Sequence, residues 1–188
     1  MFVLFHFQIH IPSSGEHERA LTEVDANLRS AFVSNARYDL ALTLVRGAAH
    51  YDGKCVIRFD AAVLPAKAPA AASAESSSSS SVLNPPNPFF LDYTGHSIQS
   101  LRVNGHDCTA CALKEGWWRD ERLTIPLARA QPGANTVEIA YRNAYDHGGD
   151  GFHQFTDPVD GCEYLYTNFE PFFAVRFCGS PIQSECSF

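Results

Sequence analysis

The chain has 188 residues, of which 45% are hydrophobic and 12% aromatic, and its formal net charge is −7. This length suits one domain with a substantial buried core. The acidic balance argues against nucleic-acid binding, because Lys and Arg are not in excess to neutralise phosphates. No apolar run approaches the roughly 20 residues that a membrane-spanning helix needs.

The six cysteines are irregularly spaced in a chain longer than a disulfide-dependent scaffold needs to be. They therefore indicate reduced thiols and a cytoplasmic protein. The first residues, MFVLFHFQIHI, have the length of a signal-peptide apolar segment. They lack a preceding basic residue and a following small-residue cleavage site. We interpret residues 1–15 as a leader, either a first strand or a non-native extension.

An amphipathic helix is predicted after the leader, roughly over residues 16–33. Ser13 and Glu16 have the spacing of a capping box, and Thr22 with Asp25 offers a second helix start. Apolar residues then recur on one face at spacings of three and four, namely Leu21, Val24, Leu28 and Phe32.

From residue 38 the apolar period changes to two, which predicts antiparallel strands with one buried face. The strand signals lie at residues 38–44, 55–59, 89–93, 98–103, 123–127 and 137–141. Asn104-Gly105 is a strong hairpin signal, because both residues tolerate positive φ. The expected fold is mainly β, an antiparallel sandwich or saddle-shaped sheet with one N-terminal helix.

Residues 65–88 are rich in Ala, Ser and Pro and include six consecutive serines, residues 76–81. Such a segment buries too little apolar surface to offset the entropy lost on ordering. We therefore predict a disordered surface insertion between strands, without a ligand site.

Cys108 and Cys111 have the spacing of half a structural zinc site, but no second Cys or His pair follows at comparable spacing. A thioredoxin-type redox pair would need a helix that opens at this point, and the sequence predicts none. We interpret the two cysteines as small apolar side chains beyond a hairpin turn.

The segment DHGGDGFHQFTDPVDGCEYLYTNFEP, residues 146–171, mixes acidic and aromatic side chains with Gly and Pro. Such loops commonly present groups to a ligand or partner. The carboxylates of Asp146, Asp150, Asp157 and Asp160 do not follow the register of a calcium loop, so we expect them to form turns. Glu163 is a fifth acidic side chain of the same loop. We expect His153 to be a hydrogen-bonded structural histidine, because no nucleophile motif accompanies it.

No complete active site is encoded, since the sequence lacks H-E-x-x-H, G-x-S-x-G, a P-loop and G-x-G-x-x-G. Several segments nevertheless resemble, in order, the N-terminal domain of zinc aminopeptidases of the aminopeptidase N family, a family of gluzincin metallopeptidases. These segments are YDLALTL, FLDYTG, SLRVNG, WWRDERLTIPL, PGANTVEIAY and GDGFHQFTDPVDGCEYLYTNFEP. The resemblance implies a β-saddle domain over residues 16–176, with the catalytic zinc held by a following domain.

In that family a Gln-x-Gln or Gln-x-Glu pattern binds the free α-amino group of the substrate. The matching triplet here is Asn168-Phe169-Glu170. The resemblance therefore implies that Glu170 binds the amine and that Asn168, one methylene shorter than the family's Gln, is a second contact. After Arg176 the sequence departs from the family pattern. We expect residues 177–188 to be a divergent tail and the sheet to lack its last strands.

The expected function is a substrate-recognition and scaffold domain of a zinc aminopeptidase, with no catalytic residue and no metal ligand of its own. Its expected partners are peptide N-termini and a separate catalytic domain, and open sheet edges would favour self-association. One alternative is a free-standing β-sandwich module that binds peptide N-termini or carbohydrate. Another is a product of a truncated gene without function.

Overall fold

The computed structural model describes residues 3–6, 22–63, 87, 89–119, 121–149 and 151–168. The predictions for the leader, the insertion and the tail fall outside these ranges, except for Val3–His6 and Asn87. Within these ranges, no helix has the length and apolar character to cross a membrane.

The described elements are mostly strands. In chain order they are β1 (Val3–His6), α1 (Glu23–Phe32), β2 (Val33–Thr43), β3 (His50–Ala61), β4 (Phe90–Asp92), β5 (Ser97–Val103), β6 (His106–Asp107), α2 (Thr109–Lys114), β7 (Trp118–Arg119), β8 (Arg122–Thr124), the 3-10 helix η1 (Leu127–Arg129), β9 (Gly133–Ala144), β10 (Gly151–Thr156) and β11 (Glu163–Asn168). The predicted fold class is confirmed, since the chain is mainly β with antiparallel sheets and a helix near its N-terminus.

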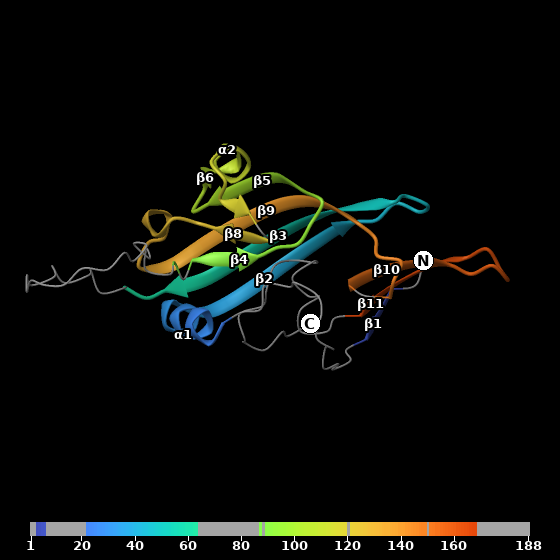
Figure 1. The fold of residues 1–188 in the computed structure, drawn as a ribbon, viewed down its shortest axis with the longest axis horizontal. Helices are drawn as coiled ribbons and strands as arrows, with labels where there is room; N and C mark the ends of the chain where they lie inside the picture. The colour runs from blue at the N-terminus through green and yellow to red at the C-terminus, as the bar shows by residue number, and fades with distance from the viewer. Residues whose placement is uncertain are drawn as a thin grey trace, which may run out of the picture.

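The strands form three sheets. The largest has the order β2-β3-β9-β5-β6, a second has the order β4-β8-β7, and the third has the order β1-β11-β10. All pairings are antiparallel except that of β1 with β11. Figure 1 shows the long strands β2, β3 and β9 running side by side through the molecule, with α1 near one end and the β10–β11 hairpin at the other.

The core is built on the central strands of the largest sheet. Alternate residues of β3 and β9 are buried, because side chains on a strand point to opposite faces in turn. Their buried cluster includes Cys55, Ile57, Val137, Ile139 and Tyr141, each at most 2% exposed. Leu123 and Ile125, in and just after β8, join the same cluster and are fully buried. This core therefore holds the second sheet against the first.

The N-terminus of α1 follows the second of the two expected starts. Thr22 is the N-cap, and its Oγ1 accepts a hydrogen bond of 3.1 Å from the backbone N–H of Asp25. A side-chain oxygen at this position satisfies one of the N–H groups that have no partner within the helix. The expected start near residue 16 lies outside the described residues.

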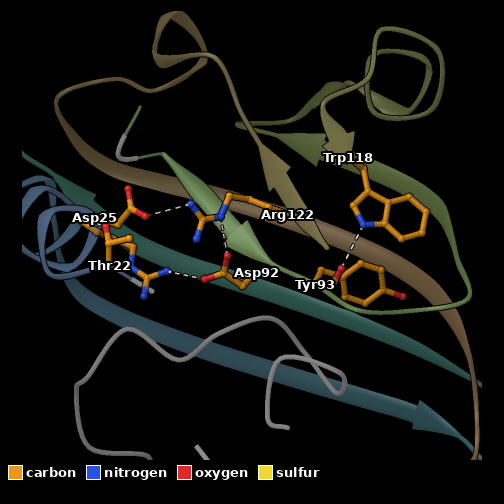
Figure 2. A network of polar contacts seen from close by, with 7 residues as sticks. Thr22, Asp25, Asp92, Tyr93, Trp118 and Arg122 are labelled. Carbon is orange, nitrogen blue, oxygen red and sulfur yellow. Dashed lines mark hydrogen bonds and ion pairs between the residues drawn. The ribbon is translucent and has the colours of Figure 1, made fainter. Parts of the chain in front are cut away.

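Helix α1 is joined to the second sheet by a network of buried charges. Arg122 Nε lies 2.7 Å from Asp92 Oδ1, and Arg122 Nη1 lies 3.3 Å from Asp25 Oδ2. Arg29 Nη1 lies 3.4 Å from Asp92 Oδ2. Both guanidinium groups lie over the ring of Phe90. Figure 2 shows Arg122 between Asp25 and Asp92, so that β8, β4 and α1 meet at this network.

The prediction that no helix opens at Cys108 is wrong. The six-residue helix α2 begins at Thr109, directly after its N-cap Cys108. Two local contacts stabilise this start: Asp107 Oδ1 accepts from Thr109 N–H at 2.9 Å, and Thr109 Oγ1 accepts from Leu101 N–H at 3.0 Å. Six residues are too few for helical periodicity to be recognised in the sequence.

The cysteines around α2 have the character of packed side chains. Cys108 is 1% exposed, and the described cysteines, Cys55, Cys108, Cys111 and Cys162, are free thiols. Burial raises the pKa of Cys111, and the nearby Glu115 raises it further. Because the thiolate is the reactive form, this environment does not favour a redox pair.

Candidate functional site

The site expected from sequence lies at the base of the β10–β11 hairpin. The two strands pair from Gly151 opposite Asn168 to Thr156 opposite Glu163. Asn168, the first residue of the triplet Asn168-Phe169-Glu170, is therefore the last residue of β11 and lies far from the hairpin tip. Phe169 and Glu170 lie outside the described residues, so the position of the Glu170 carboxylate stays a prediction.

The carboxylates at the hairpin tip form turns, as the sequence predicts. Asp157 Oδ1 accepts from Val159 N–H at 2.8 Å. Asp160 Oδ1 accepts from Cys162 N–H at 2.7 Å, and its Oδ2 accepts from the Tyr164 hydroxyl at 3.0 Å. These two hydrogen bonds hold the pKa of Asp160 below its usual value. In the part of the chain that the structure describes, no three His, Cys, Asp or Glu side chains are grouped to hold a metal ion.

His153 is a packed, hydrogen-bonded side chain. It is 7% exposed, its Nδ1 accepts from Gly149 N–H at 3.1 Å, and its ring lies 4.6 Å from that of Tyr166. Asp146 Oδ2 lies 4.0 Å from the same nitrogen. The structural role predicted for His153 is therefore consistent with its contacts.

The side-chain amide of Asn168 is held in one orientation, but only one of its two polar atoms forms a hydrogen bond within the described residues. Its Nδ2 donates to Gly149 O at 3.2 Å, whereas its Oδ1 is buried and has no hydrogen-bond partner among the described residues. A buried polar atom without a partner costs about 1–3 kcal/mol. An N–H or ammonium group that reached Oδ1 would remove this cost. Asn168 thus combines a fixed amide with a vacant acceptor.

The hairpin is fixed by residues that are distant in sequence. Glu163 Oε2 accepts from Gly47 N–H at 2.8 Å, and Glu163 Oε1 accepts from Gln154 Nε2 at 2.6 Å. The same Gln154 amide donates to Ala48 O at 3.0 Å. Gly47 and Ala48 belong to the turn between β2 and β3, so these bonds join the hairpin to the largest sheet.

Aromatic packing reinforces this junction. The rings of Tyr51, Tyr145 and Phe152 lie 5.1–5.4 Å apart, centroid to centroid, and each is at most 4% exposed. Sequence reasoning grouped Glu163 with the ligand-facing acidic loop, but the structure uses it to position the hairpin. Its partner Gly47 is 116 residues away, so no local pattern could have revealed this role.

Glu163→Gln is expected to loosen the hairpin locally. Glutamine keeps one oxygen, and its NH₂ group cannot accept the second N–H, so one of the two bonds is lost. Opening at Gly47 should become easier by about 1–1.5 kcal/mol, which corresponds to roughly tenfold faster amide hydrogen exchange. Exchange measured by NMR checks this. Glu138→Gln, at a partly exposed ion pair between β3 and β9, is the control. Equal Gly47 exchange in wild type and Glu163→Gln would contradict the role.

Comparison with known proteins supports a relation to aminopeptidases. No family model matches the chain. The chain is 28% identical over 152 residues to aminopeptidase N of Streptomyces lividans. The match covers 80% of this chain and 15% of that protein, so this chain spans a small part of the relative's length. The match therefore supports the relation to aminopeptidases that the sequence motifs indicate. It does not fix the role of this part of the protein.

Proposed function

We propose that this chain is the substrate-recognition and scaffold part of a zinc aminopeptidase, equivalent to the N-terminal domain of aminopeptidase N-like enzymes. The observation that carries the proposal is the similarity to aminopeptidase N over 80% of the chain. The vacant acceptor of Asn168 supports it, because this residue begins the triplet that matches the family's amine-binding pattern.

The proposed chemistry is recognition of a free peptide N-terminus. The carboxylate of Glu170 accepts charge-assisted hydrogen bonds from the α-ammonium group, and Asn168 Oδ1 accepts a further one. Such bonds are roughly twice as strong as those between neutral groups. A peptide without a free α-amino group cannot form them, so the site selects chain ends.

The hairpin supplies the rigidity that this recognition requires. Holding a substrate at a fixed position relative to reacting groups lowers the entropic part of the barrier. The bonds of Glu163 and the ring cluster at Phe152 fix β11, and β11 leads directly into the triplet. The scaffold role thus consists of fixing the direction in which Asn168 and the residues after it enter the site.

The metal chemistry is assigned to a separate domain. The sequence contains no H-E-x-x-H motif, and the described residues offer no group fitted to hold zinc. Zinc held by that domain would supply water activation for peptide-bond hydrolysis. No step through the metal is assigned to residues of this chain, which instead bind and orient the amino end.

The test is to assay the chain alone and joined to a catalytic domain that carries H-E-x-x-H. The joined polypeptide should release N-terminal residues from peptides, lose this activity on chelation and regain it with zinc. The 188-residue chain alone should release none. The matched control is the catalytic domain without this chain, which should show at least about 100-fold lower kcat/KM, because the amino end is no longer held. Undiminished activity of that control would contradict the recognition role.

A further inference from the structure

The hairpin presents an aromatic face that the rest of the described chain leaves partly uncovered. Because Phe155 pairs with Tyr164 and His153 pairs with Tyr166, these four side chains lie on one face of the hairpin. The opposite face carries Phe152, which packs against Tyr51 of the main sheet. We call the side chains of Phe155, Tyr164 and Tyr166 the outer face.

Apolar side chains of this hairpin are exposed to solvent in the described part of the chain. Phe155 is 46% exposed, and Val159, at the adjoining tip, is 91% exposed. Tyr164 and Tyr166 are partly exposed. At the inner end of the same face, the Gly149 backbone bonds to both His153 and Asn168. The most exposed side chains lie from Tyr166 toward the tip.

The hairpin carries carboxylates and no Lys or Arg. From Asn143 to Asn168 the sequence contains no Lys or Arg, whereas Asp157 and Asp160 flank the tip. Asp160 is directly beside the outer face, because its Oδ2 accepts from the Tyr164 hydroxyl. Two copies of this face would repel each other, whereas a cationic partner is attracted. Aromatic rings beside carboxylates also suit Lys and Arg through cation–π contacts.

We propose that the outer face binds the part of a peptide substrate that carries Lys or Arg, so that the protein favours peptides with a basic residue several positions from the amino end. The proposal rests on the proposed function, which places the amino end at Asn168 and Glu170. Tyr164 precedes Asn168 by four residues on β11. Four residues of extended chain span about 13 Å, so a peptide held at the end of β11 and extended along the outer face toward the tip would place its fifth residue over Tyr164 and beside Asp160.

The experiment titrates the full 188-residue chain, labelled with ¹⁵N, with three synthetic peptides. They are Ala-Gly-Ser-Gly-Arg-Gly amide, the same peptide with Gln at position five, and Ala-Arg-Ser-Gly-Gly-Gly amide. Each is used with a free and with an acetylated amino end. The peptide with Arg at position five should bind about fivefold more tightly than the other two and shift the NMR signals of the outer face. Its advantage should shrink as salt rises, because exposed charges are screened.

Variants separate the docking surface from the folding of the hairpin. Asp160→Asn removes the charge but keeps an oxygen for Cys162 N–H, so the turn is retained. Asp160→Asn and Phe155→Ser should each abolish the preference for Arg at position five. Asp39→Asn on β2 and Leu113→Ser on α2 change an exposed carboxylate and an exposed apolar side chain elsewhere. Both controls should keep the preference.

The outcomes distinguish this proposal from the proposed function. Equal affinity for the Arg and Gln peptides overturns the docking surface, even where acetylation still weakens binding. Equal affinity for Arg at positions two and five overturns it as well, because the spacing is then wrong. Outer-face signals that shift with protein concentration alone would show a second copy on this face and overturn it too. If the preference for Arg at position five remains and acetylation does not weaken binding, the docking surface is supported and the amine site is contradicted.

Discussion

Asp92→Asn is expected to lower the free energy of unfolding by about 3–5 kcal/mol, because the change leaves two buried guanidinium groups with a single carboxylate. Asp92 contacts both Arg122 and Arg29, and the two arginine side chains are only 8% and 7% exposed. Asp25 would remain the sole carboxylate of the network. Arg122 Nη2 is already buried without a hydrogen-bond partner, so the described network has no spare acceptor.

Urea denaturation measures this change. Asp39→Asn is the matched control, since Asp39 pairs with Arg58 on the surface, where the two side chains are 66% and 55% exposed. An exposed pair of this kind contributes at most about 1 kcal/mol, so the control should barely shift the midpoint. Equal destabilisation by the two substitutions would show that the buried network does not hold α1 to β4 and β8.

Glu170→Ala should have the largest effect on function, at about 100-fold in kcat/KM. If Glu170 binds the substrate ammonium as proposed, the substitution removes its charged acceptor, and a charge-assisted hydrogen bond in a closed site is worth about 1.5–3 kcal/mol. Both kinetic constants should change: KM rises because binding weakens, and kcat falls because a misplaced amine also misplaces the scissile bond.

The elements that sequence predicted correctly are specified by neighbouring residues. The Thr22 cap acts on Asp25, three positions away, and the Asn104-Gly105 turn has φ values of 50° and 81°, as such a hairpin requires. Alternating apolar residues likewise placed β3 and β9 because half of each strand is buried. Short-range rules therefore sufficed for the long strands of the largest sheet, but the segment treated as a loop forms β10 and β11.

The features that sequence missed depend on partners that are distant in the chain or on very short segments. The contacts of Glu163 with Gly47 and of Arg122 with Asp25 join residues about 100 positions apart. Neither pair leaves a periodic signal. Helix α2 was missed because its six residues are too few to show a helical period. The candidate amine site came from the family resemblance, and the vacant acceptor of Asn168 came from the structure alone.

The most direct measurement is kcat/KM for alanine p-nitroanilide in the polypeptide that joins this chain to a catalytic domain carrying H-E-x-x-H. Wild type, Glu170→Gln, Glu170→Ala and the remote variant Asp39→Asn would be compared. If a carboxylate of this chain holds the substrate ammonium, Glu170→Ala falls about 100-fold, Glu170→Gln lies between it and wild type, and Asp39→Asn is unchanged. Equal kcat/KM in all four proteins would mean that the amino end is recognised elsewhere.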